Sequence, residues 1–166
     1  IQDGLLYQAE ILGIQNGSKG NPGELSGVIR YSQENQVGEI DKNCSNGIYG
    51  RINGASRDQF TWEKMPIGYK QDMKLGKAEI LFQLDDQVEP FEVEITKIDM
   101  DHEDTNKSFV IQVTDPRLLS ATGGIVQGMS GSPVIQDGKI VGAVTHVFVQ
   151  DSSSGYGIFI ETMLDQ

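Results

Sequence analysis

The chain has 166 residues, which is enough for one domain with a core of its own. Its formal net charge of −11 at pH 7 argues against a nucleic-acid partner, because phosphate recognition requires clustered Lys and Arg; the simplest role of the acidity is solubility. The single cysteine, Cys44, excludes an intrachain disulfide, and no apolar run approaches the roughly 18 residues of a membrane span.

The first third of the chain alternates strand and turn signals. Leu5–Ile14 is rich in apolar residues and predicts a strand, which ends at the turn cluster Gln15–Ser18. Lys19–Gly23 is a second run of turn-forming residues. Gly27–Ser32 and Gly47–Ile52 are short strand candidates, and we expect a polar loop between them.

The middle of the chain predicts a hairpin followed by an acidic loop. Lys77–Leu84 and Phe91–Ile98 are the expected strands, and FEVEI within the second alternates apolar and acidic residues, as a half-buried strand does. The loop Asp99–Asn106 alternates acids somewhat like a calcium loop, but it lacks the glycine and the terminal glutamate of that motif. We therefore expect no bound metal and no cofactor.

The last third continues with short strands and tight turns. Strands are expected at Ser108–Thr114, Val134–Gln136, Lys139–Val149 and Gly157–Ile160. Asp137-Gly138 is a typical hairpin turn, and a helical tail is expected from Glu161. This spacing of strands and turns predicts a mostly β domain of the Greek-key or barrel kind.

The stretch GGIVQGMSGSP carries the candidate chemistry. A serine hydroxyl needs a base that takes its proton and donors that stabilise the oxyanion. The glycines around Ser130 allow a tight turn that aims the backbone N–H groups of Gly128 and Ser130 at one point, which predicts an oxyanion hole. A purely structural turn is the alternative. Ser132 is the competing nucleophile, but it lacks the preceding Gly-Met turn.

The segment from this turn into the following hairpin resembles the nucleophile hairpin of chymotrypsin-like serine peptidases. The longer segment TDPRLLSATGGIVQGMSGSPVIQDGKIVGAVTHVFVQDSSSGYGIFIETML is similar to the signature region of the SpoIVB peptidase family. The stretches KGNPGEL and NGIYG also resemble this family. The resemblance implies an all-β fold, a chymotrypsin-like double β-barrel, with short helical segments near Asp115 and at the C-terminus. It also places Asn21–Gly23 beside the cleft.

The same resemblance implies the catalytic residues. Ser130 corresponds to the family's nucleophile and Asp115 to its catalytic aspartate. The family's histidine lies in a Gly-His motif, which we expect upstream of Ile1. Thr145, His146 and Val147 would line the substrate pocket.

Reasoning from the residues alone leaves alternatives for these roles. Asp115 before Pro116 is also typical of a helix cap. His102, in the acidic loop, is best explained as a solvated surface histidine. His146 lies on the strand after the nucleophile hairpin, where it either shapes the pocket or is hydrogen-bonded in the fold; a role as base is less favoured.

The family resemblance implies a sporulation serine endopeptidase that cleaves a membrane-anchored regulator of an intramembrane protease, and thereby starts processing of a sigma-factor precursor. It also implies self-cleavage, and signalling across the space between the two forespore membranes. We expect residues 1–166 to be one peptidase domain of a longer protein, which also has a membrane anchor, a PDZ domain and the Gly-His segment upstream. Homodimers or other self-association are a further expectation. The alternative from another class is a catalytically silent β-barrel that binds peptides.

Overall fold

The computed structural model describes residues 3–57, 64–85, 87–101 and 103–166. The chain divides into two compact units, one made of residues 1–13 and 26–64, the other of residues 14–25 and 65–166. The prediction of a single peptidase domain stays a prediction.

The first unit contains an open antiparallel sheet. β4 (Gln36–Cys44) lies in its centre, between β1 (Gly4–Tyr7) and β5 (Gly47–Ile52). The expected polar loop between residues 32 and 47 is therefore wrong. β4 is rich in polar side chains, and its strand character comes from pairing on both edges, which the sequence pattern of β4 alone does not reveal.

Short elements complete the first unit. The strand expected at Leu5–Ile14 is interrupted at Gln8, which separates β1 from β2 (Ala9–Gln15). β2 pairs with β3 (Glu24–Ile29) in a two-stranded sheet. The 3-10 turn η1 and the helix α1 occupy Gln33–Asn35 and Gly54–Arg57.

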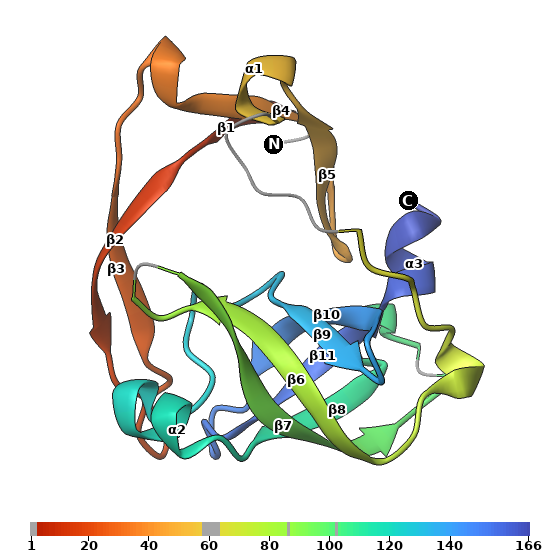
Figure 1. The fold of residues 1–166 in the computed structure, drawn as a ribbon. Helices are drawn as coiled ribbons and strands as arrows, with labels where there is room; N and C mark the ends of the chain where they lie inside the picture. The colour runs from red at the N-terminus through yellow and green to blue at the C-terminus, as the bar shows by residue number, and fades with distance from the viewer. Residues whose placement is uncertain (1–2, 58–63, 86, 102) are drawn as a thin grey trace. The chain divides into compact units, whose positions relative to one another are not determined.

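The second unit is a closed antiparallel barrel (Figure 1). Its strands follow one another around the barrel in the order β10 (Lys139–Val147), β11 (Ser154–Phe159), β8 (Phe109–Val113), β7 (Val88–Ile98), β6 (Gly76–Gln83) and β9 (Pro133–Gln136). The all-β, chymotrypsin-like fold class is thereby confirmed. Among the described residues, these six strands form a closed barrel, whereas the three-stranded sheet of the first unit is open.

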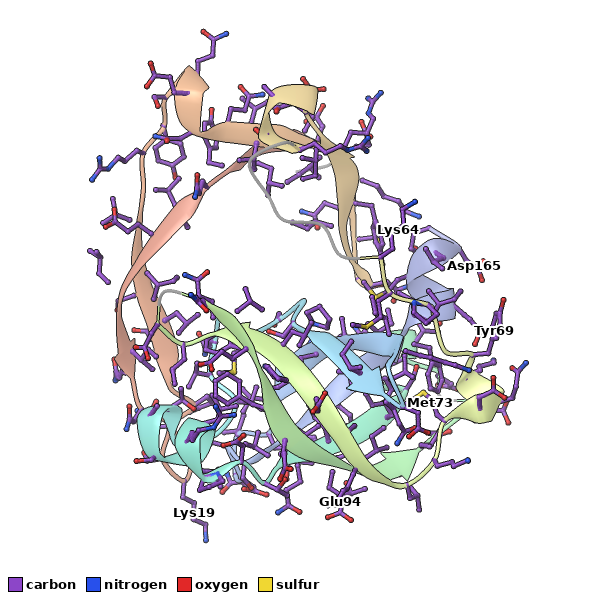
Figure 2. The ribbon with its side chains drawn as sticks, viewed as in Figure 1. Lys19, Lys64, Tyr69, Met73, Glu94 and Asp165 are labelled. Carbon is purple, nitrogen blue, oxygen red and sulfur yellow. The ribbon has the colours of Figure 1, made fainter. Side chains whose placement is uncertain are left out.

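Alternation of apolar and polar residues explains why the barrel strands form. On β7 the side chains of Phe91, Val93 and Ile95 are buried, and Glu92 and Glu94 between them are exposed. Figure 2 shows Glu94 pointing away from the barrel. The inward side chains of all six strands fill one core, which removes their apolar surface from water.

The turns and helices of the barrel unit agree with the sequence patterns. Asp137 and Gly138 both have positive φ, 50° and 72°, as a type I′ hairpin turn requires. The expected helices are present as α2 (Pro116–Thr122) and α3 (Ile160–Leu164). The 3-10 turns are η2 and η3, at Lys70–Asp72 and Thr105–Lys107. None of the helices in the described part of the chain has the length and apolar character that crossing a membrane requires.

Candidate active site

Ser130 lies on an exposed turn between α2 and β9. Its hydroxyl donates a hydrogen bond to the carbonyl oxygen of Thr145 on β10, at 2.7 Å. The turn is attached to the same strand through Val144, which accepts from the Gly131 N–H at 2.8 Å and donates to the Ser132 carbonyl at 2.9 Å. A rigid barrel strand therefore supports an accessible hydroxyl.

The backbone around Ser130 leaves two N–H groups without acceptors. The amides of Met129, Gly131 and Ser132 donate to backbone carbonyls. Within the described residues no acceptor is found for the N–H groups of Gly128 and Ser130. Gly128, near the start of the turn, has a φ of 106°, which only glycine adopts readily. The two free N–H groups are those that the sequence predicts as the oxyanion hole.

The predicted substrate strand has one free edge. The pairing of β10 with β9 ends at Ala143. The next residue of β10, Val144, is hydrogen-bonded to Gly131 and Ser132 of the Ser130 turn. Beyond that point, His146 and Val147 pair with β11 on one side, and Thr145 lies at a β-bulge in this pairing. On the other side of Thr145–Val147, no strand of the described chain pairs. An extended peptide can pair with such an edge.

The side chains of this segment are accessible to different degrees. His146 is exposed and stands opposite Tyr156 on β11. Thr145 is partly buried, and its hydroxyl donates to the carbonyl of Asn106 at 2.6 Å. The predicted pocket role of Thr145, His146 and Val147 stays a prediction. His102 lies outside the described residues.

Asp115 caps helix α2. Its Oδ1 accepts from the backbone N–H of Arg117 at 2.9 Å and from Nε of the same residue at 3.2 Å. Its Oδ2 accepts from Nη2 of Arg117 at 2.9 Å and from the Glu92 N–H at 3.2 Å. The bonds from Arg117, with that from the Glu92 amide, lower the pKa of Asp115 from 3.8 to about 2, against the opposing effect of burial. The cap interpretation is confirmed, and four donors occupy the carboxylate.

No hydrogen bond joins Asp115 and Ser130 among the described residues. Ser130 bonds to Thr145, which follows Val144; Val144 pairs with Gly157 on β11, which in turn pairs with Phe109 at the start of β8. Asp115 follows the other end of β8. The role of Asp115 as a catalytic aspartate stays a prediction, without a contact in the described chain that supports it.

The comparison with known families agrees with this geometry. The sequence model of the SpoIVB peptidase S55 family matches residues 1–164. The chain belongs to this family. The SpoIVB peptidases are serine peptidases of sporulation. Membership of this family confirms the predicted enzyme class, a serine peptidase. No curated protein matches the chain.

One contact of this SpoIVB-family site was missed at the sequence level. The resemblance of KGNPGEL to the family places the Asn21–Gly23 turn beside the cleft, but it indicates no partner for this turn. In the structure Gly23 and Leu25 both bond to the backbone of Gln127, inside the nucleophile segment. Nothing in the local pattern of KGNPGEL indicates this long-range pairing.

A buried threonine holds the start of the nucleophile segment. The hydroxyl of Thr122 accepts from the Gly124 N–H at 3.2 Å and lies within hydrogen-bonding distance of the carbonyls of Leu118 and Gly124. Thr122 is fully buried. This hydroxyl fixes the turn between α2 and the candidate active site.

We expect Thr122→Val to destabilise the protein by about 1–3 kcal/mol, because the Gly124 N–H loses its acceptor while it remains buried. At about 2–4 °C per kcal/mol for a protein of this size, thermal unfolding should show the loss clearly. The matched control is Thr114→Val, at an exposed threonine, which should leave the melting temperature almost unchanged. Equal melting temperatures of the two variants would contradict the assignment.

Proposed function

We propose that this chain carries the nucleophile of a serine endopeptidase and that Ser130 is that nucleophile. The observation that carries the proposal is the combination, at one place, of an accessible hydroxyl and two N–H groups without acceptors in the described chain, Gly128 and Ser130. A tetrahedral intermediate of peptide hydrolysis needs these donors beside the attacked carbonyl. The free edge of Thr145–Val147 would hold the substrate backbone.

The proposed reaction is acyl transfer to Ser130 followed by hydrolysis. The hydroxyl now donates to the Thr145 carbonyl, so it must turn to a base before it attacks. We propose that the histidine of the upstream Gly-His segment takes this proton and returns it to the leaving amine. The Gly128 and Ser130 amides would then donate to the oxyanion.

The biological role is proposed from the family to which the chain belongs. The substrate would be a membrane-anchored regulator of an intramembrane protease, cleaved between the forespore membranes so that a sigma-factor precursor is processed. Self-cleavage and self-association are part of the same proposal. The contacts of Asp115 favour a role in holding α2 rather than in orienting the histidine.

A fluorophosphonate reagent tests the proposal directly. The full-length protein should be labelled, and mass spectrometry should locate the adduct on the peptide that contains Ser130. Ser132→Ala is the matched control and should be labelled at the wild-type rate. A full-length protein that neither reacts nor cleaves peptides would instead support a silent peptide-binding barrel.

A further inference from the structure

A short backbone segment is hydrogen-bonded to the nucleophile turn from outside the barrel. The N–H of Gln127 donates to the carbonyl of Gly23 at 2.7 Å, and the carbonyl of Gln127 accepts from the N–H of Leu25 at 2.9 Å. Glu24 and Gln127 thus form a parallel bridge. We refer to Gly23–Leu25 as the strap.

The loop before the strap is anchored in turn. The N–H of Gly17 donates to the Thr122 carbonyl at 2.9 Å, and the N–H of Gly20 donates to the Val149 carbonyl at 3.0 Å. Figure 2 shows the side chain of Lys19, in the same loop, pointing away from the protein. The loop is therefore held at two places by its backbone, and it fixes where the strap begins.

The strap determines the direction of one proposed oxyanion donor. The carbonyl of Gln127 and the N–H of Gly128 belong to the same peptide unit, and in a trans peptide these two groups point in opposite directions. The N–H of Leu25 holds the carbonyl toward the strap. The Gly128 N–H must then point away from the strap, to the side where no described residue accepts it.

The Leu25 side chain covers the same peptide unit. A Cβ atom at Gly128 would lie 2.7 Å from Cδ1 and 2.9 Å from Cγ of Leu25, so the leucine contacts the Gly128 backbone closely. Leu25 is partly buried and packs against the barrel core. Glycine at position 128 permits rotation of the peptide unit, and this packing opposes that rotation.

We propose that Leu25 is a positioning residue for the oxyanion hole: it keeps the Gln127–Gly128 peptide in the orientation in which the Gly128 N–H can bind the oxyanion. This inference rests on the proposed function, because it matters for catalysis only if Ser130 is the nucleophile. Preorganised donors act without reorienting during the reaction. Loss of the Leu25 packing should therefore affect the transition state more than substrate binding.

The kinetic test uses the full-length protein. Leu25→Ala should lower kcat by about 10- to 100-fold, short of the 10²- to 10³-fold effect of deleting an oxyanion donor, while KM changes less than about threefold. Leu25→Met conserves volume and should restore kcat to within about threefold of wild type. Leu12→Ala removes a leucine side chain that is 65 % exposed, and it should have no effect.

A structural measurement decides the inference independently of activity. The orientation of the Gly128 N–H vector, measured by residual dipolar couplings, should be single in the wild type and averaged in Leu25→Ala. If Leu25→Ala does not fold, Leu25→Val serves in its place, with the same direction of change.

An unchanged orientation of the Gly128 N–H vector, or a kcat loss matched by Leu12→Ala, overturns the role of Leu25 and leaves the peptidase proposal standing. If the wild-type protein has no activity, the peptidase proposal fails. The orientation of the Gly128 N–H vector in Leu25→Ala still shows whether Leu25 holds the Gln127–Gly128 peptide.

Discussion

Ser130→Ala should reduce kcat for peptide cleavage by at least about 10⁴-fold, because without the hydroxyl no acyl intermediate can form. What remains would come from the oxyanion donors and substrate binding alone. The folded state should be almost unaffected, within about 0.5 kcal/mol, because the side chain is exposed and makes one hydrogen bond, to the Thr145 carbonyl. Cleavage of unstructured peptides by the full-length protein, followed by mass spectrometry, measures the first effect, and thermal unfolding measures the second.

Ser132→Ala gives this experiment its matched control. Ser132 lies two residues away in the same turn, and its backbone N–H and carbonyl bond to Met129 and Val144. Alanine keeps both backbone bonds, so the variant should cleave at a rate near that of wild type. If Ser132→Ala abolishes cleavage and Ser130→Ala does not, the assignment of the nucleophile is reversed.

The barrel could be predicted because its signals are local. The alternation in FEVEI places Phe91 and Val93 inward, and Asp137-Gly138 sets the β9–β10 hairpin; both features are found in the structure. The exposed turn at Ser130 follows in the same way from the glycines around it. Local patterns suffice where neighbouring residues determine the conformation.

The remaining features depend on contacts between distant residues. β4 has too few apolar side chains to be recognised by itself, and it is defined by its pairing with β1 and β5. The contact of Leu25 with Gly128 joins segments about a hundred residues apart in the sequence, and no local pattern encodes it. Asp115 illustrates a different difficulty, because an aspartate before a proline suits both a helix cap and a catalytic carboxylate.

Asp115→Ala should destabilise the folded state by about 2–4 kcal/mol. It removes a helix cap, which is worth roughly 1 kcal/mol, and it leaves the partly buried Glu92 N–H and the Arg117 guanidinium without this acceptor. Arg117 has other contacts, with the Pro90 carbonyl at 3.0 Å and above the Phe91 ring at 4.8 Å, so it should keep part of its position. Thermal unfolding of the variant measures the loss.

The pH dependence of stability gives a second measure of the same contacts. Because the pKa of Asp115 is lowered to about 2 in the folded chain from an ordinary 3.8, its contribution is complete above pH 3.8. The contribution declines as the pH falls below that value, and it is lost once the pH passes through about 2. Asp115→Asn should lack this part of the acid dependence, so its stability should change less than that of wild type between pH 4 and pH 2.

Activity below the unfolding transition separates the two roles of Asp115. A carboxylate that orients the histidine is worth about 10⁴-fold in kcat, and its loss need not lower stability. The contacts with Arg117 and Glu92 predict the opposite for Asp115→Asn: a lower melting temperature, and fluorophosphonate labelling of Ser130 within about tenfold of wild type. Arg117→Gln removes the other half of the same ion pair, and it should produce a similar pattern of losses. A 10⁴-fold loss of labelling in Asp115→Asn alone, at unchanged melting temperature, would assign the carboxylate to the catalytic machinery and overturn the cap as its main function.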